Sequence, residues 1–186
     1  MRKNDEFRNL TPILLDGSNI YLHCWCAMVS SERKLTMGYK VLALQGNAAL
    51  GWDTTIKELL IEFSDEVSQK MENGEYDEIL EESYFLPSVY FCLALEAGQN
   101  EVCGMYIATY MPAAIKRRLY VDCVVTAKKW RGRGIFSEAL LPHMKSLGKE
   151  LECETIDLTS AKPAAQSVYR KAGFEEPTTA FRLPLK

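Results

Sequence analysis

The fold is decided by the stretch Lys129-Trp130-Arg131-Gly132-Arg133-Gly134-Ile135-Phe136-Ser137, which has the composition of a glycine-rich turn between a strand and a helix. It follows the apolar run 119–126 and precedes a segment whose apolar residues recur at helical spacing. The free N–H groups at the start of such a helix, together with the positive end of its dipole, attract an anion. Gly132 and Gly134 allow the backbone to approach that anion closely. The turn is therefore predicted to hold phosphate.

Two other interpretations fit the same turn. An Arg-Gly-Arg-Gly sequence can be an ordinary basic loop, and arginine inserted into a narrow minor groove is a known device of DNA-binding arms. The whole chain argues against nucleic acid, because 22 Lys and Arg stand against 25 Asp and Glu and the formal net charge is -3. A local basic patch on an acidic protein fits a small anionic ligand better.

A second motif lies downstream, in residues 155–174. It begins with a short apolar strand and continues through a polar turn at Pro163 into a helix that carries Ala165 and Tyr169. Gly173 stands where a helix-ending glycine is expected. The two motifs together are far more specific than either one alone.

This pair of motifs resembles that of the GNAT acetyltransferase superfamily. The first family motif reads Arg/Gln-x-x-Gly-x-Gly/Ala, and Arg131 and Gly134 match it, with Phe136 in place of its last small residue. The second reads approximately Asn-x-x-Ala-x-x-Leu-Tyr-x-x-x-Gly-Phe, and the chain has Ala165-x-x-Val168-Tyr169-x-x-x-Gly173-Phe174, with Lys162 where the family has Asn. In the family the last small residue of the first motif lies under the cofactor pyrophosphate, so the ring of Phe136 is expected to turn away.

The resemblance implies an α+β fold, the GNAT acyl-CoA N-acyltransferase fold, in which helices flank a central, twisted, mixed and mostly antiparallel sheet. One domain is expected over residues 1–186, with the core at 51–186 and an N-terminal extension or first strands at 1–50. A chain of 186 residues with 47% hydrophobic content is long and apolar enough to bury one substantial core.

The order of predicted elements agrees with that fold. An extra β-hairpin-like segment is expected around Asp16-Gly17-Ser18-Asn19. One helix is predicted from a capping box of Thr55 with Glu58 to the helix-ending pair Asn73-Gly74. The remaining predictions are a strand at 40–44, a helix at 76–84, strands at 89–95, 102–110, 119–126 and 155–159, and a kink at Pro142 in the helix after the glycine-rich turn.

The resemblance also implies acetyl-CoA as cosubstrate and assigns roles to individual residues. Tyr169 is implied as the donor of a proton to the coenzyme A thiolate, and a backbone N–H near Val124 or Val125 as the group that polarises the thioester carbonyl. For the ammonium of Lys162, a cofactor phosphate and water are both open, and water is favoured. The implied cofactor-binding residues are Cys123, Val124, Val125, Arg131, Gly132, Arg133, Gly134, Ile135, Phe136, Ser137, Lys162 and Ala165.

Acetylation of an amine also requires a base, because an alkyl ammonium has a pKa near ~10.4 and must lose a proton before it attacks. Asp122 is the predicted base, since it lies on the strand whose splayed end should admit the acceptor. Alternation along the strand leaves open whether its side chain faces that end. Glu96, Glu101 and His143 are the alternatives.

The leading functional hypothesis is an acetyl-CoA-dependent N-acetyltransferase that acts on a primary amine by direct transfer through a tetrahedral intermediate. The alternative is a non-catalytic module on the same scaffold, which binds acyl-CoA or a partner protein. Acidic residues crowd the stretch 72–82, which suits either a cationic acceptor or a solvated helix face. Whether the chain forms a homodimer stays open.

A cytoplasmic protein is expected, since no apolar run approaches the length of a membrane span and no leader opens the sequence. The six cysteines are not expected to form a disulfide framework in a chain of this length. Cys92, Cys103 and Cys123 lie in apolar runs and are predicted to be buried thiols. Cys24-Trp25-Cys26 lacks a second Cys/His pair, so no metal site is expected.

Overall fold

The computed structural model describes residues 38–176, and the predicted hairpin around Asp16-Gly17-Ser18-Asn19 lies outside them. Its elements are β1 (Tyr39–Leu44), α1 (Gly46–Leu50), α2 (Asp53–Ile61), α3 (Asp65–Glu72), α4 (Asp77–Tyr84), β2 (Val89–Glu96), β3 (Val102–Pro112), β4 (Arg117–Thr126), the 3-10 turn η1 (Lys128–Trp130), the π-helical turn η2 (Phe136–Leu140), α5 (Leu141–Glu150), β5 (Thr155–Leu158) and α6 (Pro163–Lys171).

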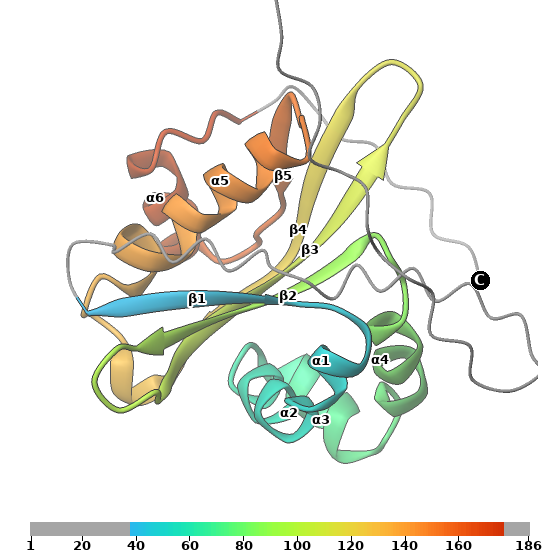
Figure 1. Ribbon diagram of the computed structural model, residues 1–186. Coiled ribbons are helices and arrows are strands. Elements are labelled where there is room, and N and C mark those ends of the chain that lie inside the picture. The colour runs from blue at the N-terminus through green and yellow to red at the C-terminus, as the bar shows by residue number, and fades with distance from the viewer. Residues whose placement is uncertain (1–37, 177–186) are drawn as a thin grey trace, which may run out of the picture.

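The five strands form one mixed sheet in the order β1-β2-β3-β4-β5. The first three pairings are antiparallel, and β4 pairs with β5 in parallel. Helices α1 to α4 lie on one side of the sheet and α5 and α6 on the other, as Figure 1 shows. The predicted α+β fold, with a mostly antiparallel sheet flanked by helices, is confirmed.

Two apolar layers, one on each side of the sheet, hold the helices in place. Because side chains alternate along a strand, β2 supplies both layers: Phe91 and Leu93 pack with the helices α1 to α4, and Cys92 and Ala94 pack with α5. Cys92, Cys103 and Cys123 are buried free thiols, as predicted.

The single helix predicted from Thr55 to Asn73 is wrong, because the chain forms two helices there. Helix α2 ends at Ile61, and α3 begins after Ser64, whose hydroxyl accepts a hydrogen bond from the Val67 N–H at 3.2 Å. The predicted capping box also fails, since α2 begins at Asp53 and Thr55 lies inside it. Apolar periodicity continues across the break because both helices bury side chains in the same layer.

A β-bulge in β4 reverses the direction of its side chains. The β3–β4 register shifts between Ile107, which lies opposite Cys123, and Ala108, which lies opposite Val121. As a result Val121 packs in the α5 layer, whereas Cys123 packs in the layer of α1 to α4. Pairing with β5 ends at Val121, so residues 122–126 of β4 extend past the last β5 partner.

The helix that follows the glycine-rich turn is irregular where Pro142 predicts it. Its first turns, η2, are π-helical and lead directly into α5, in which Pro142 is the second residue. Proline lacks the N–H that would continue the helical ladder, and π-helical turns commonly absorb such interruptions.

Candidate functional site

Two glycines with left-handed backbones build the turn between β4 and the helix. Gly132 and Gly134 both have φ of +76°, which residues with side chains rarely adopt. The first helical hydrogen bond runs from the Glu138 N–H to the Gly134 carbonyl at 2.8 Å. Within residues 38–176, the amides of residues 132–137 have no backbone acceptor. We call these six groups the amide row, and their position at a helix start suits an anion.

The two arginine side chains of the turn contact other groups of the protein. Arg131 donates from Nε to the Thr126 carbonyl at 3.1 Å and from Nη2 to the Glu62 carbonyl at 3.2 Å. The guanidinium of Arg133 lies 4.9 Å from the ring centroid of Trp130. Direct contact of the two arginine side chains with a cofactor therefore stays a prediction. The backbone amides of the turn are the groups left free for an anion.

The side chains of Ile135 and Ser137 also serve the turn. Ile135 is buried in the α5 layer, so its backbone N–H is the group it can offer to a ligand. The Ser137 hydroxyl donates to the Gly134 carbonyl at 3.0 Å. A Cβ added to Gly134 would lie 2.6 Å from a carboxylate oxygen of Glu138, which places that carboxylate beside the amide row.

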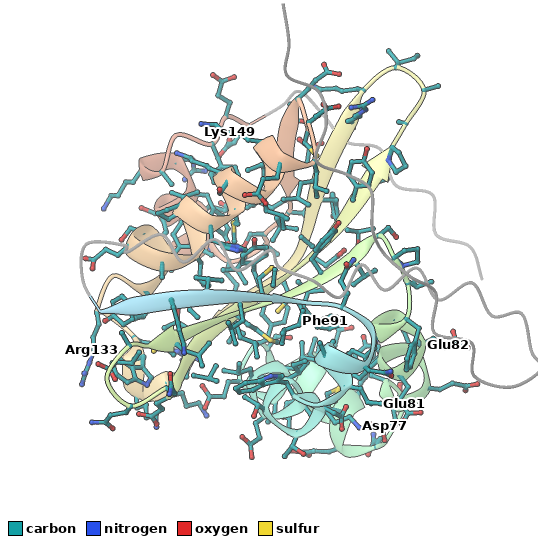
Figure 2. The ribbon with its side chains drawn as sticks, in the orientation of Figure 1. Asp77, Glu81, Glu82, Phe91, Arg133 and Lys149 are labelled. Carbon is teal, nitrogen blue, oxygen red and sulfur yellow. The ribbon has the colours of Figure 1, made fainter. Side chains whose placement is uncertain are left out.

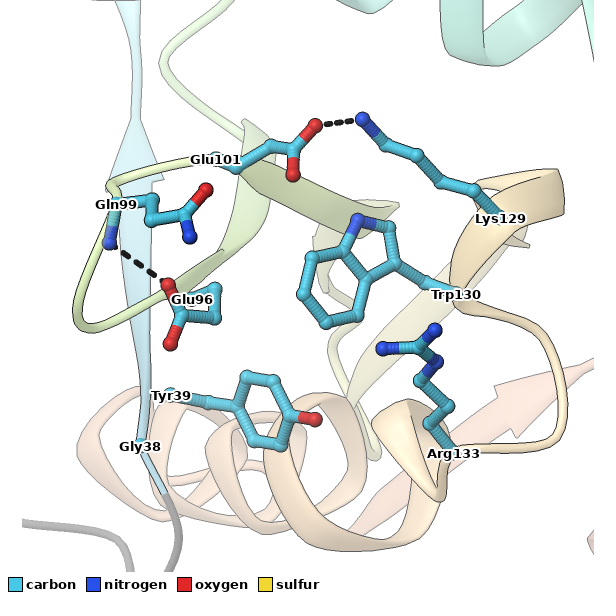
Figure 3. Close-up of a pocket in the computed structure, with 8 residues that line it drawn as sticks. All are labelled: Gly38, Tyr39, Glu96, Gln99, Glu101, Lys129, Trp130 and Arg133. Carbon is cyan, nitrogen blue, oxygen red and sulfur yellow. Dashed lines mark hydrogen bonds and ion pairs between the residues drawn. The ribbon is translucent and has the colours of Figure 1, made fainter.

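A cavity of about 660 Å³ lies next to the turn, between the start of β1 and the β2–β3 turn (Figure 3). Both of its carboxylates have protein partners: Glu96 accepts from the Gln99 backbone N–H at 2.7 Å, and Glu101 forms an ion pair with Lys129. Glu96 and Glu101, two of the alternative bases, therefore lie here. The cavity is lined by Gly38, Tyr39, Glu96, Gln99, Glu101, Lys129, Trp130 and Arg133.

Tyr169 lies on α6 between two aromatic rings. Its ring centroid is 5.5 Å from that of Phe136 and 5.7 Å from that of Phe174, and both pairs meet edge to face. Burial raises the pKa of Tyr169 above its ordinary value, with a smaller contribution from the Cys123 thiol. The Phe136 ring thus points toward Tyr169.

A second cavity, of about 670 Å³, opens in front of Tyr169 between α6 and the strands β4 and β5. The Tyr120 hydroxyl lies 3.3 Å from Thr159 Oγ1 in its wall, and Arg118 lies 3.5 Å from Asp157 in an ion pair. Sequence reasoning missed these wall residues, which only the β4–β5 register brings together. The lining residues are Lys116, Arg118, Tyr120, Ile156, Asp157, Leu158, Thr159, Ser160, Gln166, Tyr169, Arg170, Phe174, Glu175 and Glu176.

Asp122 stands at the β4 bulge and accepts a hydrogen bond from the Thr109 hydroxyl at 3.0 Å. Ile107 packs with α1 to α4, so alternation along β3 places Thr109, and with it the Asp122 carboxylate, on that same face. Burial raises the pKa of Asp122, and the Thr109 hydrogen bond acts in the opposite direction. Asp122 lines neither cavity.

His143, the third alternative base, lies on the other face of the sheet. Its Nδ1 is 2.7 Å from the Tyr106 hydroxyl, and burial lowers the pKa of His143 to about 4. Tyr106 packs in the α5 layer. The structure therefore does not bring His143 together with Asp122.

Lys162 crosses from the start of α6 to the break between α2 and α3. Its Nζ donates to the Phe63 carbonyl at 2.7 Å and lies 5.4 Å from the centroid of the Phe63 ring. The side chain stays exposed, so its ammonium has this protein partner as well as water, and its role toward a cofactor stays a prediction. Ala165 is half-buried in the first turn of α6, while Cys123, Val124 and Val125 lie on β4 beyond the last β5 partner.

Residues 38–176 contain no group of three or more His, Cys, Asp or Glu side chains placed to hold a metal ion. Every helix in this range falls short of the length and apolar character needed to cross a bilayer.

Comparison with known proteins places this geometry in context. The model of the acetyltransferase (GNAT) family matches residues 52–174. No curated protein matches the sequence. Among solved structures, a probable acetyltransferase is 16% identical with a TM-score of 0.65, and the match covers 79% of this chain and 99% of the other.

Two other solved structures show the breadth of proteins with this fold. An aminoglycoside acetyltransferase from an uncultured soil metagenomic sample, solved with sisomicin, is 20% identical with a TM-score of 0.61, covering 80% of this chain and 97% of its own. A transcriptional regulator from Bacillus halodurans is 22% identical with a TM-score of 0.64, covering 78% of this chain and 100% of its own. Identities this low establish a shared fold alone.

Proposed function

Since this chain belongs to the GNAT acetyltransferase family, we propose that it moves an acetyl group from acetyl-CoA to a primary amine by direct transfer. The observation that carries the proposal is the placement of Tyr169, a half-buried phenol framed by two aromatic rings. Acetyl-CoA supplies the activated acyl group as a thioester. The residues of this chain bind it, orient it and hold the protons.

The amide row fits the pyrophosphate of the cosubstrate. Six backbone N–H groups without backbone acceptors stand at a helix start, and Gly132 and Gly134 present no Cβ to an approaching phosphate. The Glu138 carboxylate lies beside Gly134 and opposes an anion there. We infer that this carboxylate moves outward when phosphate binds.

The free edge of β4 fits the acyl end. Residues 122–126 extend past the last β5 partner, and Ala165 contributes a small side chain to the first turn of α6. We assign the polarisation of the thioester carbonyl to a backbone N–H at Val124 or Val125, which would stabilise the charge that develops on its oxygen. Tyr169 then holds the proton that the departing thiolate takes.

Asp122 is our candidate for the base. Burial raises its pKa, so its carboxylate accepts a proton more readily than an exposed carboxylate does. Its side chain faces the layer of α1 to α4. We propose that the acceptor amine reaches β4 from this face and loses its proton to Asp122, directly or through water.

We propose a cationic amine as the acceptor class, but on grounds other than the acidic stretch 72–82. Glu78, Glu81 and Glu82 are exposed on α4, which packs against α1, and line neither cavity. The support comes from the carboxylate of Asp122 and from the solved aminoglycoside acetyltransferases of the same fold, whose names give aminoglycosides as the acceptors.

Calorimetry with acetyl-CoA, followed by a free-thiol release assay, tests this function. The amine panel should contain aminoglycosides, polyamines and peptides with free N-termini. Binding of acetyl-CoA with thiol release on at least one amine supports the proposal. Binding without release on any amine would favour the non-catalytic acyl-CoA-binding module.

A further inference from the structure

Phe136 occupies the position where the family motif has glycine or alanine, and its side chain makes a contact that neither of those residues can make. The ring lies 5.5 Å from Tyr169 with the planes 71° apart. Phe174 meets the same tyrosine at 5.7 Å and 64°. We propose that Phe136 is a positioning residue, which fixes the ring of Tyr169 for proton donation; this inference rests on the proposed function of Tyr169.

The three rings come from two separate parts of the fold. Phe136 begins η2, whereas Tyr169 and Phe174 lie on α6 and directly after it. Edge-to-face pairs favour particular relative orientations of the two rings, so contact on two sides restricts the plane of the middle ring. Once that plane is fixed, the phenolic oxygen has a defined position relative to the glycine-rich turn.

The same contact joins the two ends of the proposed cosubstrate site. The backbone N–H of Phe136 belongs to the amide row, and its side chain touches the proposed acid. A residue that binds phosphate through its backbone and packs on Tyr169 through its ring would place the acid relative to the bound thioester. Displacement of the reacting groups by a fraction of an ångström is enough to slow a proton transfer.

A merely structural role is the competing explanation, because Phe136 also packs at the margin of the α5 layer. The two roles differ in what they change. Loss of packing lowers stability and leaves the chemistry of the folded fraction intact. Loss of positioning lowers kcat in protein that is fully folded and fully loaded with cosubstrate.

The experiment compares Phe136→Ala, Phe136→Leu and Phe136→Tyr with the parent enzyme at saturating acetyl-CoA. We expect Phe136→Ala to lower kcat about tenfold, equivalent to about 1.4 kcal/mol of barrier, while the Kd for acetyl-CoA changes less than about threefold. Phe136→Leu keeps apolar volume without a ring, secures a folded variant and should also lose kcat. Phe136→Tyr restores the ring and should restore kcat.

A second readout follows Tyr169 itself, without any turnover. Absorbance titration, referenced to Tyr169→Phe, should show the pKa of Tyr169 lower in Phe136→Ala than in the parent, because the cover that buries the phenol is gone. Phe85→Ala, which removes an exposed ring from outside both cavities, is the matched control and should change neither readout.

The outcomes separate this inference from the proposed function. Unchanged kcat together with an unmoved Tyr169 titration in Phe136→Ala would overturn the inference. So would a weaker affinity for acetyl-CoA with kcat preserved, which would make Phe136 a cofactor-binding residue only. If the parent acetylates no amine, the proposed function fails, whereas the Tyr169 titration still reports whether the ring contact exists.

Discussion

At the scale of single residues, the proposed acetyl transfer depends most directly on Tyr169. Tyr169→Phe should lower kcat by roughly 10²-fold, the usual contribution of a positioned general acid. The affinity for acetyl-CoA should change little, because the variant keeps the ring that packs between Phe136 and Phe174. Steady-state kinetics and calorimetry on the same preparation check both halves. An undiminished kcat would mean that the thiolate takes its proton from another group.

The amide row makes a second prediction, with opposite signs for two neighbouring positions. Gly134→Val should weaken acetyl-CoA binding at least tenfold, because a backbone at φ +76° strains a β-branched residue and the new Cβ meets the Glu138 carboxylate. Glu138→Gln leaves the backbone alone and removes a negative charge beside the bound phosphates, so it should strengthen binding several-fold. That gain should shrink as added salt screens the charge. Calorimetry at low and high salt measures both, and equal affinity of all three proteins would place the phosphates elsewhere.

Buried His143 gives stability a dependence on pH. Burial lowers its pKa to about 4 from an ordinary value of 6.5, and its Nδ1 shares a hydrogen bond with the Tyr106 hydroxyl, whose pKa burial raises. Between pH 6.5 and 4, His143 therefore binds a proton in the unfolded chain but not in the folded chain. The stability that neutral His143 permits is complete above pH 6.5 and is lost as the pH falls through this window, by up to about 3 kcal/mol. Urea unfolding of the parent and of His143→Gln should show a steeper acid loss in the parent; parallel pH profiles would contradict this.

At the scale of elements, the break between α2 and α3 is hydrogen-bonded to both motifs of the site. Arg131 donates to the Glu62 carbonyl, Glu62 accepts from the Lys128 N–H at 2.6 Å, and Lys162 donates to the Phe63 carbonyl. The helix break that sequence reasoning missed is thus the point where the first helical layer contacts the glycine-rich turn and the start of α6.

Removal of one of these hydrogen bonds should loosen the break between α2 and α3 without unfolding the protein. Lys162→Met keeps the apolar stem and loses the charged donor, a bond worth about 1 kcal/mol at an exposed site. Hydrogen exchange at amides 62–64 should then be roughly fivefold faster, while amides in β2 keep their protection. Lys145→Met, which changes an exposed lysine of α5, is the matched control. Unchanged exchange at 62–64 would show that the Arg131 and Lys128 contacts hold the break without Lys162.

Prediction from sequence succeeded where the determining interactions are local. The glycine-rich turn and the helix before Gly173 were predictable because glycine backbones and helix starts leave a signature within a few residues. The helix break has such a signature too, since Ser64 precedes Asp65 and Glu66, but the continuous apolar periodicity concealed it. The bulge at Asp122 and the contact of Phe136 with Tyr169 have none, because strand register and the docking of α6 determine them.

At the scale of the whole molecule, the acidic residues of α4 lie away from the glycine-rich turn (Figure 2). Asp77, Glu81 and Glu82 lie together on α4, whereas Arg133 lies at the other end of the sheet beside the glycine-rich turn (Figure 2). Electrostatic attraction between exposed charges decays over a Debye length of about 8 Å at physiological salt. The acidic face of α4 is thus expected to keep the protein soluble and to have little influence on a ligand at the turn.

The triple variant Glu78→Gln/Glu81→Gln/Glu82→Gln tests this separation against a change at β4. Because its three carboxylates line neither cavity, we expect the acceptor KM and its salt dependence to match the parent. Asp122→Asn removes a single charge and should lower kcat/KM by at least tenfold, since the amine then loses its base. Steady-state kinetics with one cationic amine at several salt concentrations compares the two. If instead the triple variant raised the KM at low salt and flattened its salt dependence, the acceptor would approach past α4, and Asp122 would not be the only carboxylate that selects it.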